Sequence, residues 1–243
     1  MRTAILSDIH ANLEALQAVC GAAGQHCIDR WICLGDIVGY GADPKACLEQ
    51  IRRLTDQTLL GNHDAAAVGL VDLGYFNQHA RQAAIWTADQ LAPSERDYLA
   101  ALPLTRSFGD ALFVHAEPRC PGLWKYVLSR ADAIDALNAT DARFCFVGHS
   151  HHPFACIQDR TQVEMAGIPA EAFAIEENRR YLVNVGSVGQ PRDGDSRSCF
   201  LIWDDERQTL EFVRVAYDIG AAQRKILAAG LPAVLAQRLA SGR

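Results

Sequence analysis

The segment Thr3-Ala4-Ile5-Leu6-Ser7-Asp8-Ile9-His10 is a short apolar run that ends in an aspartate and a histidine. The same arrangement returns along the chain, where further apolar runs lead into Gly35-Asp36, Gly61-Asn62-His63-Asp64, His115 and Gly148-His149-Ser150-His151. Five of the eight histidines lie in these motifs, which argues against chance placement. Short apolar runs bounded by glycine or polar residues are typical of buried strands. We therefore predict strands over residues 3–6, 30–34, 57–60, 111–114 and 143–147, each with polar side chains at its C-terminal end.

Helical patterns lie between the first three of these predicted strands. Asn12 is the predicted N-cap of a helix over residues 13–23, and Asp43-Pro44 supplies an N-cap followed by proline for a helix over about 44–54. Alternation of strand and helix indicates parallel strands joined by right-handed crossovers. Ligand sites in such α/β sheets gather beyond the carboxyl ends of the strands, which is where the motifs fall.

The remainder of the chain is expected to complete one domain over residues 1–243. Residues 65–102 show helical patterns without a strand, and we interpret them as a lid-like segment beside the site. The second half contains predicted strands at 154–158, 181–185, 199–203 and 210–215, whose close spacing favours antiparallel or mixed pairing. Residues 218–243 form a predicted helical tail, broken at Gly230-Leu231-Pro232.

Composition excludes several classes of protein. The net charge of −6 and the pI of about 5.7 argue against stable nucleic-acid binding, which needs a basic surface. No stretch approaches the ~20 apolar residues of a membrane span, and no targeting segment is visible, so we expect a cytoplasmic protein without a membrane partner. None of the eight cysteines is paired at two-residue spacing. They are interpreted as small buried hydrophobes rather than as disulfides or thiolate metal ligands.

The residue types in the motifs indicate metal chemistry. Carboxylate, amide oxygen and imidazole together suit borderline divalent ions, and a pair of such ions can clamp the oxygens of a phosphate. In an extended segment residues i and i+2 point to the same side. We therefore expect Asp8 with His10, and His149 with His151, to face the metal cluster together. The two oxygens of Asp36 make it the natural bridge between ions ~3.5–4 Å apart.

The residues of the Gly-Asn-His-Asp motif are expected to have different roles. Asn62 offers a neutral oxygen ligand, which leaves His63 free to donate a proton to the leaving oxygen or to hydrogen-bond the transferring phosphoryl group. Asp64 is interpreted as the N-cap of a helix over residues 65–70.

A glycine-rich loop over residues 184–192 follows a predicted strand and ends in Arg192. Its guanidinium could bind a phosphate bidentately, and the alternative is an ordinary tight turn with a solvated arginine. Tyr40, and less favourably Tyr75, could stack on a nucleobase at the opening of the predicted site. The alternative role of each ring is packing.

Together, the motifs resemble those of the calcineurin-like metallophosphoesterase superfamily. The order Asp-x-His, Gly-Asp, Gly-Asn-His-Asp, a lone His and Gly-His-x-His is specific to it. The stretches at residues 35–44, 76–80 and 186–192 are similar to its small bacterial and archaeal phosphodiesterase branch. The resemblance implies a four-layer α/β/β/α sandwich with mixed sheets and a dinuclear metal site at the strand C-terminal ends.

The family pattern also implies a ligand set. One ion would be held by Asp8, His10, Asp36 and His151, and the other by Asp36, Asn62, His115 and His149. His63 would lie near the scissile phosphate. One departure is that many relatives continue Gly-Asp with an Asp-Arg pair three residues on, whereas this chain has Gly39-Tyr40. The usual aspartate partner of His63 is therefore missing.

The resulting functional hypothesis is a phosphoesterase that uses two divalent ions, drawn from Mn, Fe, Ni, Co or Zn. We expect in-line attack of a metal-bound hydroxide on a small phosphorylated substrate, with phosphodiester and nucleotide or dinucleoside polyphosphate hydrolysis favoured. The alternative is a non-catalytic scaffold or binding protein, because this fold also occurs as a metal-poor scaffold in membrane-coat complexes. Retention of all seven candidate ligands disfavours it. A nuclease is disfavoured by the acidic charge.

Overall fold

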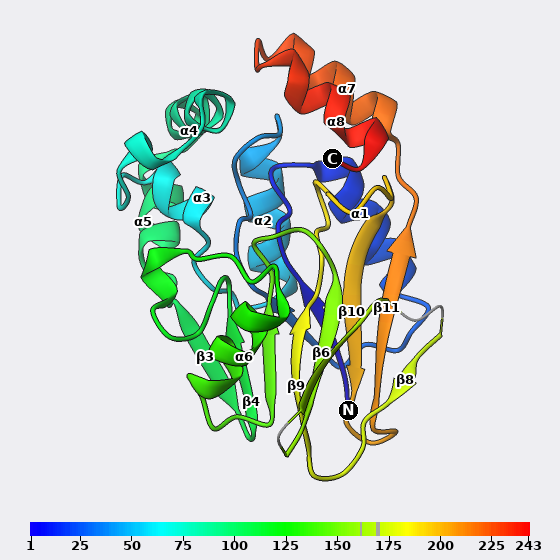
Figure 1. The fold of residues 1–243 in the computed structure, drawn as a ribbon. Helices are drawn as coiled ribbons and strands as arrows, with labels where there is room; N and C mark the ends of the chain where they lie inside the picture. The colour runs from blue at the N-terminus through cyan, green and yellow to red at the C-terminus, as the bar shows by residue number, and fades with distance from the viewer. Residues whose placement is uncertain (161, 169–170) are drawn as a thin grey trace.

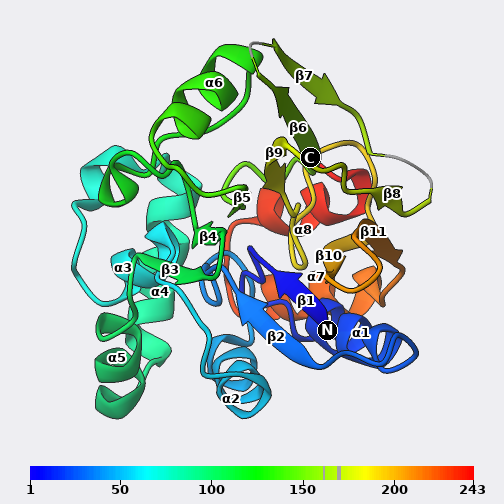
Figure 2. The same cartoon turned by 90° about the horizontal axis from the view of Figure 1, so that it is seen from below.

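The computed structural model describes residues 1–160, 162–168 and 171–243, which form two β-sheets that pack face to face (Figures 1 and 2). The first sheet has the order β2 (Arg30–Cys33), β1 (Arg2–Leu6), β10 (Ser198–Asp204), β11 (Thr209–Val215) and β8 (Phe173–Ala174). The second has the order β3 (Thr105–Phe108), β4 (Ala111–Val114), β5 (Phe144–Val147), β9 (Arg179–Asn184), β6 (Phe154–Asp159) and β7 (Gln162–Ala166). Both sheets are mixed: β1 runs parallel to β2, and β4, β5 and β9 run parallel to one another, while the remaining pairs are antiparallel.

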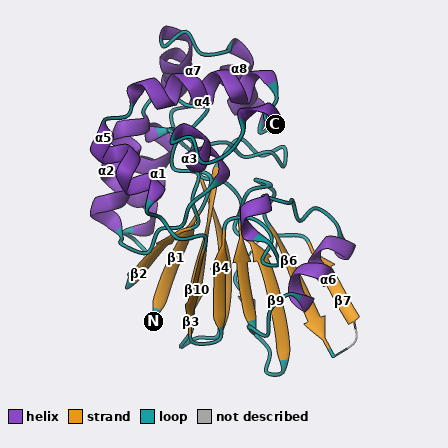
Figure 3. Cartoon of the chain, turned by 90° about the vertical axis from the view of Figure 1, so that its left-hand side faces the viewer, coloured by secondary structure: helices purple, strands orange, loops and turns teal. Residues whose placement is uncertain are grey.

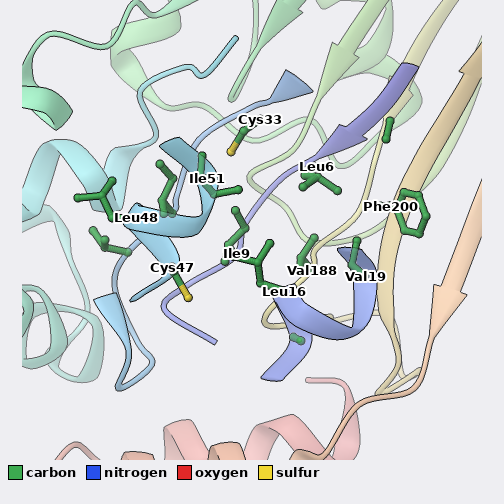
Figure 4. Close-up of a cluster of buried hydrophobic side chains, with 14 of the residues drawn as sticks. Leu6, Ile9, Leu16, Val19, Cys33, Cys47, Leu48, Ile51, Val188 and Phe200 are labelled. Atoms are coloured by element: carbon green, nitrogen blue, oxygen red, sulfur yellow. The ribbon is translucent and has the colours of Figure 1, made fainter. Parts of the chain in front are cut away.

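Helices cover the outer faces of both sheets. Helices α1 (Leu13–Ala23) and α2 (Pro44–Leu54) pack on the first sheet through a buried cluster that includes Leu16, Ile51 and Phe200 (Figure 4). Helix α6 (Arg130–Asn138) covers the second sheet, and the cluster beneath it includes Leu137 and Cys145. The predicted four-layer α/β/β/α sandwich is therefore confirmed.

The core between the two sheets is aromatic. Phe113 stacks on Phe146 with ring centroids 5.1 Å apart, and Trp203 of the first sheet packs against Phe146 at 5.3 Å. Buried aromatic side chains of this size contribute strongly to stability because each removes a large apolar area from water. This core fixes the distance and orientation between the two sheets, and hence between the motifs at their ends.

The remaining helices gather at the end of the strands where β1 finishes (Figure 3). They are α3 (Asn62–Ala67), the short 3₁₀ turn at Leu73–Tyr75, α4 (Gln78–Gln90), α5 (Pro93–Ala100), α7 (Ile219–Ala228) and α8 (Ala233–Ser241). A buried cluster joins Ala83 of α4, Ile226 of α7, Leu235 of α8 and the ring of Tyr40. The C-terminal helices thus pack beside the loop that follows Asp36.

One predicted strand was wrong, and three strands and one helix of the structure were not predicted. Residues 57–60 do not form a strand, because their pairing stops at a single bridge between Thr58 and Cys33, after which Leu60 N donates a hydrogen bond to Pro103 O. Strands β3, β7 and β8 were not predicted, since they are short and lack a continuous apolar run. Helix α6 was also missed, although Ser129 and Asp132 form a capping box at its start.

All eight cysteines are free, and five of them are buried as expected, whereas Cys20 is half-buried and Cys27 and Cys120 are exposed. Among the described residues, no helix combines the length and apolarity needed to cross a membrane.

Candidate metal centre

The sequence motifs come together at one edge of the molecule because their strands run parallel. Asp8 follows β1 and Asp36 follows its parallel neighbour β2, while His115 follows β4 and His149 follows its parallel neighbour β5. Packing of one sheet on the other brings the two pairs of strand ends together. A hydrogen bond of 2.9 Å from the amide of His149 to Asp8 Oδ2 joins the two sheets at this point.

The backbone at the site is left-handed rather than extended. Asp8, His10, Asp36, His149 and His151 have φ between 50° and 64°, a conformation that is uncommon for residues other than glycine. The expectation that i, i+2 alternation of a strand orients these pairs was therefore wrong. The chain turns sharply beyond each strand end, and the side chains converge through these turns. Clusters of such residues mark functional sites, since the surrounding structure must stabilise the strain.

The first group of possible metal ligands consists of Asp8, His10 and His151, whose donor atoms lie within 4.8 Å of one another. Nε2 of His151 is 3.2 Å from Asp8 Oδ1, and Nε2 of His10 is 3.7 Å from the same oxygen. The two Nε2 atoms are 3.1 Å apart. All three side chains are buried.

The second group consists of Asp36, His115 and His149, with Asn62 beside it. Nε2 of His115 lies 3.4 Å from Asp36 Oδ2 and 3.3 Å from Asn62 Oδ1. Asp36 Oδ2 is also 3.6 Å from Nε2 of His10 in the first group. One oxygen of Asp36 therefore lies between the two groups.

Backbone carbonyls fix the orientation of the histidine rings. The Nδ1 atoms of His10, His115 and His151 lie at hydrogen-bonding distance from the carbonyl oxygens of Val38, Leu34 and Gln190, and His149 uses Nε2 toward Trp124 O at 2.8 Å. When each of these nitrogens donates, the other ring nitrogen is left as an acceptor facing the cluster. Metal-binding histidines are usually held in this way.

The carboxylates show that the site suits cations. Asp8 Oδ1 and Asp36 Oδ2 are buried and have no hydrogen-bond partner. A buried carboxylate without compensation is costly, and a divalent ion bound by carboxylate, amide and imidazole would remove that cost. The described residues therefore fit a pair of divalent metal ions.

The pKa shifts follow from burial and from the mixture of charges. Burial by itself raises the pKa of Asp8 and Asp36, but the neighbouring histidines, His151 for Asp8 and His115 for Asp36, bring both pKa values well below the ordinary range. Burial lowers the pKa of His149 to about 4 and that of His151 to about 3. Burial also disfavours the charged form of His115, but Asp36 and Asp8 raise its pKa to about 9. Burial therefore favours the neutral form of His149 and His151, whereas the carboxylates favour the protonated form of His115.

His63 lies beside the first group of ligands and also lines the cleft described below. Its ring packs against His10, Tyr40 and Phe76 with centroids 5.0, 4.3 and 5.0 Å away, and its Nδ1 is buried without a partner. A Cβ atom at Gly39 would lie 2.8 Å from this Nδ1, so the glycine leaves room for the ring. Burial holds the pKa of His63 well below its usual value. His63 also falls within 4.8 Å of donor atoms of His10 and Asp36, which makes it an alternative ligand.

Asp64 is not the N-cap as predicted, but its carboxylate caps the helix from the third position. Helix α3 begins at Asn62 with Gly61 as N-cap, so that Asp64 occupies its third position. The side chain accepts 3.1 Å hydrogen bonds from the amides of Gly61 and Val38. It therefore ties α3 to the loop after Asp36. Burial and the Asp36 charge raise the pKa of Asp64 to about 7.

An open cleft of about 490 Å³ adjoins the second group of ligands, with Asn62, His63 and His149 in its wall. Its other walls are largely aromatic. Tyr126 stacks on His149 with ring centroids 4.0 Å apart, and Tyr75 at the rim is 90% exposed. Trp124 and Tyr126 were missed in the sequence, although the aromatic stretch Trp124-Lys125-Tyr126 follows His115 by only a few residues.

Arg192 and Tyr40 lie together beside the first group. The Arg192 guanidinium is 5.7 Å from the centre of the Tyr40 ring, and its Nη2 donates a 2.8 Å hydrogen bond to Gln190 Oε1. Tyr40 is only 6% exposed because its ring packs on His10 and His63. Tyr40 lines the cleft but offers a substrate little free surface, whereas the rings of Tyr75 and Tyr126 are exposed there.

Comparisons with known proteins agree with this arrangement. Residues 1–207 match the family model described as the calcineurin-like phosphoesterase superfamily domain. The uncharacterized protein MJ0912 of Methanocaldococcus jannaschii is 40% identical in an alignment of 245 positions that covers 99% of this chain and 98% of that protein. The crystal structure of a metallophosphoesterase from Sphaerobacter thermophilus is 40% identical, with a TM-score of 0.90 and coverage of 100% and 99% of the two chains. The hypothetical protein PH1004 from Pyrococcus horikoshii shares the fold at 19% identity, with a TM-score of 0.80 and coverage of 100% and 98%.

Proposed function

The chain belongs to the calcineurin-like phosphoesterase superfamily, and from this premise we propose that it is a metal-dependent phosphodiesterase that acts on small organic phosphates. Nucleotide diesters and dinucleoside polyphosphates are the substrates we favour. The observation that carries the proposal is the position of Asp36 Oδ2, buried and unpartnered between two groups of metal-binding side chains.

The ligands in the proposed dinuclear centre divide as follows. Asp8, His10 and His151 would hold one ion, Asn62, His115 and His149 would hold the other, and Asp36 would contact both. When bound, the two ions neutralise the phosphate oxygens and lower the pKa of water, with Mn, Fe, Ni, Co and Zn all compatible with the mixed donors.

The chain's own residues orient the phosphate. His63 packs on His10 of the first group and also lines the cleft beside the second, so its ring can hydrogen-bond an oxygen of the reacting phosphate or pass a proton to the leaving oxygen. Its amide is anchored on Asp36 Oδ1, which fixes the ring relative to the cluster. We propose that His63 contacts substrate and that metal binding is left to the other residues.

The aromatic cleft supports an ester with a flat organic group on its phosphate. An ester oxygen at the cluster must carry an organic group, and the cleft beside Asn62 and His149 gives that group space. The exposed rings of Tyr75 and Tyr126 suit a flat substituent such as a nucleobase or an aryl group, because stacked aromatic pairs are favourable beyond the area they bury.

A substrate panel tests this function. Protein loaded with Mn²⁺ would be assayed against bis(p-nitrophenyl) phosphate, p-nitrophenyl phosphate, ATP and diadenosine tetraphosphate. We expect the diester to be hydrolysed with a higher kcat/KM than the monoester, and Tyr126→Ala to raise KM for aryl and nucleoside substrates. Tyr126→Phe is the matched control, since it keeps the ring. Absence of hydrolysis for every ester at full metal occupancy would support the non-catalytic scaffold instead.

A further inference from the structure

Two arginines from distant parts of the chain meet at one neutral oxygen. Arg192, at the end of the loop after β9, donates to Gln190 Oε1 at 2.8 Å, and Nη1 of Arg238 on α8 donates to the same oxygen at 3.2 Å. Both guanidinium groups lie over the ring of Tyr40, at 5.7 and 6.0 Å from its centre. Two like charges are thus held beside each other.

In the part of the chain that the structure describes, neither arginine pairs with an Asp or Glu side chain. Arg192 and Arg238 differ in this from the arginines that form ion pairs with Asp or Glu in the described parts of the chain. Those arginines are Arg2, Arg53, Arg179, Arg197, Arg207 and Arg214. Nε of Arg192 is buried without a partner, whereas Nε of Arg238 donates at 2.7 Å to an oxygen of Arg243, the last residue of the chain, whose terminal carboxyl group can carry a negative charge. Burial and the charge of Arg192 lower the pKa of Arg238. Partly buried charges of one sign are costly unless an opposite charge joins them.

The pair lies next to the first group of ligands. The Arg192 amide donates to His151 O at 3.3 Å, and the carbonyl of Gln190 lies at hydrogen-bonding distance from His151 Nδ1. The Tyr40 ring beneath both guanidinium groups contacts His10 and His63. An anion at the pair would therefore lie close to a phosphate at the cluster, whereas the aromatic cleft borders Asn62 and His149 of the second group.

We propose that Arg192 and Arg238 form an anion subsite for a second phosphate group of the substrate. The inference rests on the proposed function and narrows it to phosphate esters that carry a further phosphate beside the one that is cleaved. Guanidinium groups bind phosphate oxygens bidentately, and two of them can share one phosphate. Arg238 belongs to helix α8, which lies beyond residues 1–207 matched by the family model, so this element of specificity comes from the C-terminal helices.

A binding experiment tests the subsite without turnover. Metal-free protein in EDTA at low ionic strength would be titrated with inorganic pyrophosphate by calorimetry. Arg192→Gln and Arg238→Gln are each expected to weaken binding by about tenfold to a hundredfold, which corresponds to one lost charge-assisted contact. Arg224→Gln on the neighbouring helix α7, where the side chain is exposed, is the matched control and should bind as the unchanged protein does. Unaltered binding by Arg238→Gln would overturn the proposal, as would the absence of any pyrophosphate binding.

A pair of substrates that differ by one phosphate separates this inference from the function on which it rests. The p-nitrophenyl esters of AMP and ADP would be compared with Mn²⁺-loaded protein. Arg238→Gln should lower kcat/KM about tenfold or more for the ADP ester, and by a clearly smaller factor for the AMP ester. Equal losses on both esters would overturn the subsite and leave the phosphodiesterase intact. If the unchanged protein hydrolyses neither ester, the proposed function fails, while the pyrophosphate titration still decides the subsite.

Discussion

The amide of His63 donates a 2.8 Å hydrogen bond to Oδ1 of Asp36, so one oxygen of this carboxylate is committed to the protein. The other oxygen, Oδ2, is left unpartnered between His10 and His115. Gly61 makes this arrangement possible, because a Cβ atom there would collide with Asp36 Oδ1. The same residue thus fixes the phosphate-facing histidine and presents one oxygen to both groups of ligands.

Asp36→Asn should be the most damaging single change among the ligands. The amide of asparagine can still accept from His63 through its oxygen, but it would then direct an NH₂ group, rather than a charged oxygen, at the cluster. We predict loss of at least one metal ion per chain and near-complete loss of turnover, with the fold retained by circular dichroism. Asp56→Asn, at an exposed position, is the control. Full metal occupancy with normal activity would remove the two-metal account.

His63→Ala should separate chemistry from metal binding. If His63 contacts the phosphate, the metal content measured by elemental analysis stays at the level of the unchanged protein while kcat falls by ~10²–10⁴, the usual range for a lost acid–base group. Because His63 also lies near donor atoms of His10 and Asp36, loss of one ion in this variant would instead identify it as a ligand.

Metal binding should stabilise the fold. The unpartnered oxygens of Asp8 and Asp36 gain a partner only in the metal-bound protein. Each ion at 100 times its dissociation constant adds about 2.7 kcal/mol to the free energy of unfolding. For a chain of this size each bound ion raises Tm by about 5–10 °C, measurable by differential scanning calorimetry with EDTA and with Mn²⁺. An equal Tm in both conditions would show that no ion is bound.

Arg192→Ala should discriminate between classes of substrate. We predict that kcat/KM falls more for ATP than for bis(p-nitrophenyl) phosphate, with no change in metal content, because a guanidinium–phosphate pair needs a second phosphate to form. Equal losses on both substrates would count against a polyphosphate site. No loss on either would mean that Arg192 only completes a turn.

Local signals in the sequence predicted the local structure well. The N-cap at Asn12 and the proline at position 44 mark helices that begin where expected, and the apolar runs before Asp8, His115 and His149 are strands. Such features depend on neighbouring residues alone, which is why one sequence suffices to find them. The four-layer fold followed from the resemblance to a family rather than from these patterns.

Features that depend on tertiary packing could not be predicted from the sequence. The left-handed backbone at His10 and His151 is imposed by contacts between strand ends, and nothing in the sequence of these non-glycine residues requires it. The meeting of Arg238 with Arg192 joins residues 46 positions apart through Gln190, between loop and helix. Asp64 was expected at the N-cap but occupies the third position of α3, and its second partner, the amide of Val38, belongs to another loop.

In the proposed mechanism, two ions act together at the site that Asp36 organises. The direct measurement is a titration of metal-free protein with Mn²⁺, in which bound metal per chain and the rate of bis(p-nitrophenyl) phosphate hydrolysis are followed in the same samples. We predict binding of two ions per chain, hydrolysis that rises mainly with the second ion, and no hydrolysis in EDTA. Full hydrolysis with one ion bound, or with none, would contradict this account.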